Sequence, residues 1–360
     1  MPRLAPARRG AVAYAAVASP AVATLAIPGF VNAHSHAFQR ALRGRAGGDD
    51  FWAWRDGMIA LAESLTVADV RRAYADVYRE MLDAGYTAVG EFHYLGLDEA
   101  HAAAEAAAEA GVGFVCLYAC YLRGGSPRFR QDSVASYLRE LEALRAEGIS
   151  VGVAPHSVRA CPADALRELG RYADEHGLPL HVHADEQPRE IDECVAEHGV
   201  RPIELLARAG CLTARTTVVH ATHADGRELD LLRDAGARIC VCPSTEADLA
   251  DGFLPVARVC HRGIGMCIGS DSNVRIDPLG ELRELEWIGR RQTGTRGVIS
   301  VGSLLCFGAD EGAAALGIDA WPDARVDLDH PSLRGVAEDD VYDALVFSCA
   351  ADVLRKTSLQ

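Results

Sequence analysis

The sequence predicts an α/β fold, namely a single parallel (β/α)8 barrel. Short apolar stretches with strand-like composition alternate regularly with longer helical stretches. Polar side chains gather where the apolar stretches end, and a barrel of this kind carries its chemistry at those strand ends. No Gly-x-Gly-x-x-Gly or phosphate-binding loop follows an early strand, so an open nucleotide-binding sheet is disfavoured.

Eight strands are expected, because each stretch is apolar, short and bounded by turn-forming or polar residues. The expected strands are residues 26–33, 87–92, 113–118, 150–154, 179–183, 217–220, 238–242 and 265–268. The segments between them are amphipathic or rich in alanine, as helices on the outside of a barrel should be. The expected helices are residues 67–84, 99–110, 134–147, 162–175, 189–197, 226–235 and 279–292.

Bulk composition narrows the classes of partner. The chain has 360 residues, of which 49% are hydrophobic and 24% charged, and its net charge is −15. This acidic balance argues against a nucleic-acid partner, which requires a basic surface. No segment is long and apolar enough to suggest a membrane span.

Cysteine usage favours a reducing compartment. The eleven cysteines are an odd number without metal-finger spacing, and several lie in strand-like stretches where a free thiol acts as a small hydrophobe. Arg3, Arg8 and Arg9 before the alanine-rich residues 11–18 resemble a signal peptide only faintly, because the apolar run is short. We therefore expect a cytoplasmic protein.

The most informative motif is His34-Ser35-His36 at the end of the first expected strand. Residues two apart in a strand point the same way, so both imidazoles aim at one point. His183 on the fifth strand and Asp271 after the eighth supply a third imidazole and a carboxylate. These four residues form a candidate site for a divalent metal with an open position for water.

Two further residues suggest acid–base chemistry beside this site. His220 ends the sixth strand and would crowd a single metal as a fifth ligand, so we expect it to hydrogen-bond water or substrate instead. Glu186 follows His183 closely, where a carboxylic acid can pass a proton to a leaving amine. Lys356 is the sole lysine, so no lysine lies among the expected barrel strands to bridge two metals. This favours a site with one metal.

These residues resemble the amidohydrolase superfamily, and His183-x-x-Glu186 without a bridging lysine is similar to its deaminase branch. Several segments resemble, more narrowly, the formimidoylglutamate deiminases of histidine breakdown, over about residues 26–345. The segments are HSHAFQR (34–40), FWAWR (51–55), EFHY (91–94), APHSVRA (154–160) and CPSTE (242–246).

The resemblance implies a role for each matching residue. His34, His36, His183 and Asp271 would hold one metal per chain, Zn²⁺ first and Fe²⁺ as the alternative. His220 would position the hydrolytic water, Glu186 would move its proton, and Asp271 would accept one. The implied substrate contacts are Gln39 to the formimino group and Arg55, Tyr94, His156 and Arg159 to the carboxylates.

The net charge of the chain independently supports the assignment of arginines to the substrate carboxylates. A dianionic substrate that approaches a protein of net charge −15 needs a local cationic clamp. Arginine pairs with carboxylates through two parallel hydrogen bonds, so Arg55 and Arg159 are well suited. The expected partner is thus a small dicarboxylate, with no nucleic acid and no membrane. We expect Trp52 and Trp54 to pack the loop after the first strand.

Relatives of this kind usually carry a small β domain made from both ends of the chain, and the resemblance allows a homodimer. Here that domain is expected to be truncated. We expect an N-terminal remnant at residues 1–27, the barrel at 28–310, and a helical segment with a shortened tail at 311–360. The tail from Ser348 onward lacks the strands of a full accessory domain.

Three functions stay open at this point. The first is hydrolysis of a C–N bond in a linear amidine, N-formimino-L-glutamate. The second is a related aminohydrolase that acts on another amidine or a nucleobase, for which an apolar mouth would replace the arginines. The third is an inactive barrel remnant, which the loss of a ligand or of Glu186 would mark.

Overall fold

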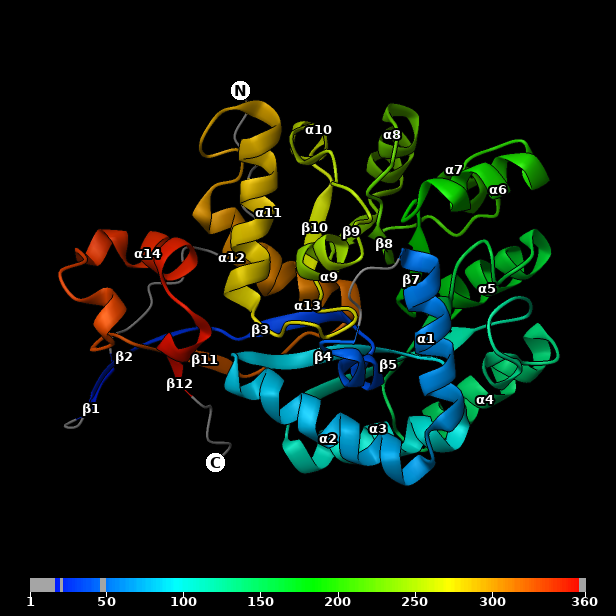
Figure 1. Cartoon of the computed structure of the whole chain (residues 1–360), viewed down its shortest axis with the longest axis horizontal. Helices are drawn as coiled ribbons and strands as arrows, with labels where there is room; N and C mark the ends of the chain where they lie inside the picture. The colour runs from blue at the N-terminus through cyan, green and yellow to red at the C-terminus, as the bar shows by residue number, and fades with distance from the viewer. Residues whose placement is uncertain (1–16, 20–21, 46–49, 356–360) are drawn as a thin grey trace.

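The computed structural model describes residues 17–19, 22–45 and 50–355. Eight parallel strands form one sheet in the order β3 to β10, and the helices surround it (Figure 1). A bridge between Ser35 at the end of β3 and Asp271 after β10 brings the two outer strands together, so the sheet is a nearly closed barrel. The predicted (β/α)8 fold is confirmed. The strands are β3 (Phe30–Ser35), β4 (Tyr86–His93), β5 (Gly113–Cys120), β6 (Val151–Pro155), β7 (Leu180–Ala184), β8 (Thr216–His220), β9 (Arg238–Val241) and β10 (Gly265–Ile268).

All seven expected helices form, and none of their bounds differs from the expected one by more than two residues. Thr66 and Asp69 make a reciprocal capping box at the start of α2, which is a sequence-local reason for that helix to begin there. The α-helices are α1 (Phe51–Ser64), α2 (Val67–Asp83), α3 (Leu97–Ala110), α4 (Val134–Ala146), α5 (Ala163–Glu175), α6 (Pro188–His198), α7 (Pro202–Arg208), α8 (Gly226–Ala235), α9 (Pro243–Asp248), α10 (Val256–Arg262), α11 (Pro278–Thr293), α12 (Val301–Gly308), α13 (Asp310–Leu316) and α14 (Val341–Ser348). The described residues also form short 3₁₀ helices, which are η1 (Ala37–Leu42), η2 (Pro127–Phe129), η3 (Pro331–Leu333), η4 (Glu338–Asp340) and η5 (Ala351–Val353).

The first expected strand, residues 26–33, is wrong as one element. The structure divides it at Gly29 into β2 (Val22–Pro28) and β3. Gly29 donates its N–H to Pro322 O at 3.2 Å, and a Cβ on it would lie 2.1 Å from Thr87 Oγ1. The chain changes sheets at this crowded point, although its apolar composition continues on both sides.

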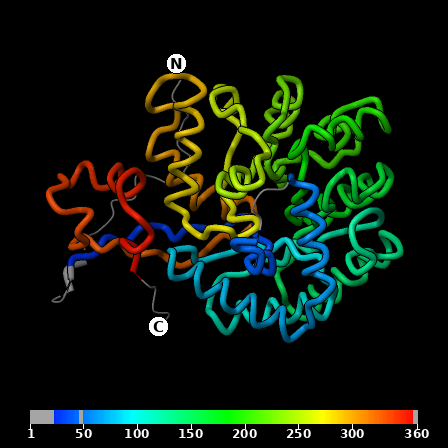
Figure 2. The backbone as a smooth tube through the Cα atoms, in the orientation of Figure 1, coloured from blue at the N-terminus to red at the C-terminus, as the bar shows by residue number. Residues whose placement is uncertain are grey.

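The ends of the chain form a second sheet in the order β1-β2-β11-β12, with β1 (Val17–Ser19), β11 (Asp323–Asp327) and β12 (Leu354–Arg355). Figure 2 shows these blue and red segments side by side at one edge of the molecule. The expectation of a tail without strands is wrong, because Leu354–Arg355 pairs with β11. The three domain boundaries stay a prediction, and residues 1–16 of the N-terminal segment lie outside the described residues.

The apolar core has two parts. A large cluster fills the space between strands and helices, and a small one occupies the barrel interior. The small cluster contains three thiols among its six members, which are Ala33, Val219, Cys240, Cys242, Cys267 and Ala315. All eleven cysteines are free. Within the described ranges, no helix has both the length and the apolar character needed to cross a membrane.

Candidate metal centre and active site

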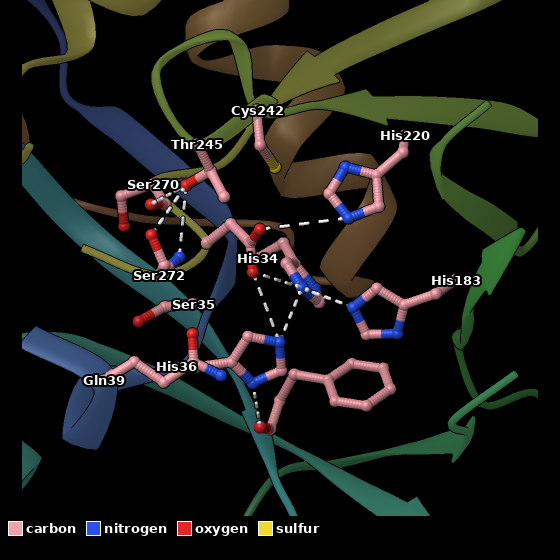
Figure 3. A network of polar contacts seen from close by, with 12 residues as sticks. His34, Ser35, His36, Gln39, His183, His220, Cys242, Thr245, Ser270 and Ser272 are labelled. Carbon is pink, nitrogen blue, oxygen red and sulfur yellow. Dashed lines mark hydrogen bonds and ion pairs between the residues drawn. The ribbon is translucent and has the colours of Figure 1, made fainter. Parts of the chain in front are cut away.

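Three imidazoles and one carboxylate converge at the carboxyl end of the barrel (Figure 3). His34 Nε2 lies 3.2 Å from His36 Nε2 and 3.1 Å from His183 Nε2. Asp271 Oδ1 lies 3.4 Å from His34 Nε2 and 3.3 Å from His36 Nε2. All four residues are buried. The barrel therefore brings together, from three strands, the four residues that the sequence suggested as ligands.

Hydrogen bonds at Nδ1 determine which nitrogen of His36 and of His183 carries the proton. His36 Nδ1 lies 2.9 Å from Phe92 O, and His183 Nδ1 lies 2.9 Å from His156 O. A carbonyl can only accept, so each Nδ1 carries the proton and each Nε2 presents a lone pair to the centre. His34 Nε2 lies next to both lone pairs and can donate at most one hydrogen. Such a set of three nitrogens and one oxygen fits a divalent cation between them.

Electrostatics keep these imidazoles in the neutral form that binds metal. Burial lowers the pKa of His34 and of His183, and the neighbouring imidazoles lower both further. Burial also lowers the pKa of His36, although Asp271 opposes that shift. Neutral imidazole is the form in which histidine ligates a metal.

His220 and Glu186 lie beside the four ligands. His220 Nε2 is 3.8 Å from Asp271 Oδ2 and 3.6 Å from Glu186 Oε1, while its Nδ1 is 3.3 Å from Glu246 Oε1. Burial lowers the pKa of His220, but Glu186, Glu246 and Asp271 outweigh it and raise the pKa to about 10. The carboxylates thus favour an imidazole that donates from both nitrogens, as holding a water or substrate oxygen requires.

Gln39 and Tyr94 lie on the η1 side of the centre. Gln39 Nε2 donates to Tyr94 Oη at 2.8 Å, and this fixes the amide orientation. Gln39 Oε1 is buried and has no hydrogen-bond partner in the described part of the chain. A buried acceptor without a partner is costly in the free protein, so Gln39 is suited to accept an N–H from a ligand.

The two arginines suggested as a clamp lie at the same aromatic ring. The guanidinium carbons of Arg55 and Arg159 are 6.0 and 5.9 Å from the centre of the Trp52 ring. Arg159 also pairs with Glu186 at 3.1 Å, whereas Arg55 forms no ion pair among the described residues. The sequence did not suggest Arg189, whose guanidinium lies closest to that ring, at 4.3 Å. Trp52 and Trp54 belong to α1, and Trp54 lines a cavity together with Leu42 and Arg43 of the segment after β3.

His156 links the metal centre to the arginines. Its ring centre lies 4.7 Å from that of His183 and 4.3 Å from that of Tyr121. Burial lowers the pKa of His156, and His183, Arg159 and Arg55 lower it further, so it is neutral. Tyr121, a polar residue at a strand end with no role suggested by sequence, lines the same region.

A cavity of about 620 Å³ includes Trp52, the ring at which the two arginines lie. Trp52 and Trp54 from α1 line one side, and Gln187, Asp248 and Ala250 line the other. A smaller cavity of about 160 Å³ adjoins Gln39 and Ser272 and shares Trp54 and Asp248 with the first. Both cavities lie between α1 and the end of α9, and the smaller one reaches Gln39.

Sequence reasoning missed the residues that hold Asp271 in place. Asp271 has a backbone φ of 44°, and Asn273 has a φ of 55°. Asn273 Nδ2 donates to Asp271 O at 2.9 Å and to Ser35 Oγ at 3.1 Å, and Ser270 Oγ donates to its Oδ1 at 2.7 Å. Asn32, a polar residue in an otherwise apolar strand, accepts the N–H of Ser270 at 3.0 Å. In the sequence, Asn32 was the feature that could have indicated these contacts.

Two histidines at strand ends do not join the cluster. His93 contacts Tyr74 Oη and Gly96 O, and His181 contacts Ala315 O. Both are buried histidines with partners in the core. Glu190, another residue without a suggested role, accepts the N–H of Glu186 at 3.1 Å and lies 3.9 Å from Arg159.

Comparison with known proteins agrees with this geometry. A formimidoylglutamate deiminase from Pseudomonas aeruginosa is 38% identical over 72% of this chain, and the chain spans 64% of that relative's length. A 5-methylthioadenosine/S-adenosylhomocysteine deaminase from Halobacterium salinarum is 31% identical over 94% of this chain and 80% of its own length. An adenosine deaminase from Xanthomonas campestris with bound zinc has the same fold, with a TM-score of 0.83, 23% identity, and coverage of 91% of this chain and 77% of that one.

The relatives therefore include enzymes named for different substrates but for one kind of reaction. The profile of the Amidohydrolase family matches residues 25–320, which include the whole barrel and all the ligand candidates. This chain belongs to the amidohydrolase family.

Proposed function

We propose that this protein is a hydrolase that converts N-formimino-L-glutamate and water to N-formyl-L-glutamate and ammonia, with one Zn²⁺ per chain and Fe²⁺ as the alternative metal. Family membership makes metal-dependent hydrolytic deamination the reaction class. The observation that supports this substrate is the pair Arg55 and Arg159, which both lie at the Trp52 ring. Arg159 also pairs with Glu186, which lies beside His220. Two guanidinium groups at one wall of a protein with net charge −15 suit a dicarboxylate.

The side chains divide the chemistry among themselves. His34, His36, His183 and Asp271 would hold the metal, which lowers the pKa of a water and polarises the substrate. His220 Nε2 orients the attacking water, and Asp271 takes a proton from it. Glu186 delivers a proton to the terminal nitrogen of the formimino group. Gln39 Oε1 accepts an N–H of that group, and Arg55 and Arg159 hold the carboxylates with Tyr94 and His156.

The reaction forms one bond and breaks another at the formimino carbon. A C–O bond forms between water and the formimino carbon, and the bond from that carbon to the terminal nitrogen breaks. The nitrogen leaves as ammonia with the two protons of the water and its own hydrogen. The remaining carbon becomes the formyl group on the glutamate nitrogen.

A second candidate is deamination of an adenosine-type nucleoside. The relative named for 5-methylthioadenosine and S-adenosylhomocysteine aligns with more of this chain than the formimidoylglutamate deiminase does. Trp52 and Trp54 in the cavity wall could stack on a base. Against this, the guanidinium of Arg55 has no partner on 5-methylthioadenosine, which is uncharged. S-adenosylhomocysteine carries one carboxylate, whereas two guanidinium groups suit two.

One experiment separates these candidates. Purified protein loaded with one equivalent of Zn²⁺ is assayed for ammonia release from N-formimino-L-glutamate, 5-methylthioadenosine and S-adenosylhomocysteine. We expect turnover of the first substrate and none of it in His183→Ala. Turnover of a nucleoside alone would replace the first candidate by the second, and no turnover of any would favour an inactive barrel.

Substitution of Arg55 tests the clamp. Arg55→Met should lower kcat/KM for the dianion about tenfold to 100-fold, because a charged hydrogen bond contributes about 1.5–3 kcal/mol. The matched control is Arg189→Met. It also removes a guanidinium from the Trp52 ring, but that guanidinium is already paired with Glu193.

Arg159→Met should reduce turnover far more than metal content, and it should also lower kcat because Glu186 loses its partner. Equal loss of bound zinc in Arg159→Met would assign that residue a structural role.

A further inference from the structure

A second set of metal-binding atoms lies next to the first. His220, Cys242 and Asp271 are buried, and a nitrogen, a sulfur and an oxygen from them all lie within 4.8 Å of one another. Asp271 belongs to both sets through different oxygens. Its Oδ1 faces His34 and His36, whereas its Oδ2 faces His220. One carboxylate can therefore bridge two cation positions.

His220 Nε2 can serve as a ligand once a cation displaces the proton that the neighbouring carboxylates favour on it. The atom is buried and forms no hydrogen bond within the described residues. Its nearest oxygens are Glu186 Oε1 at 3.6 Å and Asp271 Oδ2 at 3.8 Å, both beyond hydrogen-bond distance. Its Nδ1 faces Glu246 Oε1 at 3.3 Å, an arrangement that orients the ring of a metal-bound histidine.

Cys242 adds a soft donor. It follows β9 directly, and its sulfur points toward the imidazoles in Figure 3. Gly269 gives the thiol its room, since a Cβ there would lie 3.0 Å from Cys242 Sγ and 2.8 Å from the His34 Cβ. A side chain at position 269 would crowd both the thiol and His34.

We propose that His220, Cys242 and Asp271 form a second, inhibitory cation site that is selective for soft divalent ions such as Cd²⁺ or excess Zn²⁺. Thiolate with imidazole favours Zn²⁺ and Cd²⁺, whereas Mg²⁺ requires oxygen ligands. As the ion binds, a nitrogen–metal bond to His220 Nε2 and a sulfur–metal bond to Cys242 form, and the Nε2 proton and the thiol proton pass to solvent. The inhibition rests on the proposed function, because a His220 Nε2 bound to an ion no longer orients the attacking water.

The test begins with a binding measurement that needs no substrate. Full-length protein with one equivalent of Zn²⁺ is titrated with CdCl₂, and bound metal is counted by elemental analysis after equilibrium dialysis. Ultraviolet absorption from thiolate-to-Cd²⁺ charge transfer is followed in parallel. We expect a second equivalent to bind with the appearance of that absorption, and MgCl₂ to bind at neither position.

Cys242→Ser and Cys267→Ser are the matched variants. Both remove a buried thiol of the barrel interior, but Cys267 lies outside the three-donor set. Loss of an outer partner of a ligand already weakens metal binding about 10- to 100-fold, so loss of the thiolate in Cys242→Ser should weaken the second site at least as much. Cys267→Ser should behave as the unmodified protein.

Activity gives the second measurement, made on whichever amidine or nucleoside the protein turns over. Inhibition by Cd²⁺ should follow the second equivalent and require at least about tenfold more Cd²⁺ in Cys242→Ser. A total of one metal per chain in the unmodified protein, or charge-transfer absorption that persists in Cys242→Ser, would overturn the second site. If N-formimino-L-glutamate is not a substrate, the binding result still decides this proposal.

Discussion

Glu186 has neighbours that suit a residue exchanging protons. Arg159 lies 3.1 Å from one of its oxygens and His220 lies 3.6 Å from the other. It also lies outside the four-ligand set of His34, His36, His183 and Asp271. Proton transfer and metal retention can therefore be separated by changing this one side chain.

Glu186→Gln should lower kcat by about 10²- to 10⁴-fold, the usual contribution of a general acid or base. The amide keeps the shape of the side chain but cannot exchange the proton. Steady-state ammonia release and zinc analysis on the same preparation check this. A variant that loses zinc but keeps its kcat per bound zinc would contradict the assignment.

Asn273 holds the turn that presents Asp271, in a left-handed conformation that suits asparagine and glycine. Asn273→Ala should lower the free energy of unfolding by about 1–3 kcal/mol, because Ser35 and Ser270 lose their partner. Urea denaturation of the zinc-free protein measures this change in the free energy of unfolding. Asn273→Gly should be about 1 kcal/mol more stable than Asn273→Ala, since glycine tolerates the positive φ. Equal stability of both variants and the parent protein would assign no role to the network.

At the scale of elements, local signals placed the strands and the seven expected helices well, whereas α1, α7, α9, α10 and α12 were not expected. Capping residues and apolar periodicity are encoded within a few residues, and α2, α8 and α11 begin at the side-chain caps Thr66, Asp225 and Asp277. The division at Gly29 was not predictable in this way. Its cause is the approach of Thr87 and Pro322, which are remote in sequence.

Two glycines should respond in opposite ways to alanine. Gly29→Ala should destabilise the fold by more than about 2 kcal/mol, because its Cβ would overlap Thr87 Oγ1 at the junction of the two sheets. Gly57→Ala should stabilise it by about 0.5–1 kcal/mol, because Gly57 is exposed within α1 and a Cβ there meets nothing within 4 Å. Thermal or urea unfolding of the pair checks both signs. Destabilisation by both substitutions would contradict this account.

At the scale of the molecule, the metal centre joins the first strand of the barrel to β7 and to the turn after β10. A cation bound there would link elements that are far apart in sequence. It binds the folded chain only, since the unfolded chain does not assemble the four ligands.

Chelation should therefore lower the unfolding temperature, and zinc should restore it. At a free zinc concentration 100 times the Kd, the expected gain is about 2.7 kcal/mol. Differential scanning calorimetry with and without zinc measures the shift, and His183→Ala is the control that should show little of it. An equal shift in that variant would place the stabilising ion elsewhere.

The sequence by itself determined the alternation of strands and helices, the His-x-His pair and the absence of a bridging lysine. Each of these is local information, set by spacing or composition. Only the tertiary structure decided that His34 and His183 meet at 3.1 Å, that Arg159 pairs with Glu186, and that Cys242 lies beside His220. The reason is physical: closure of the barrel sets which strand ends face one another, and no short stretch of sequence encodes that distance.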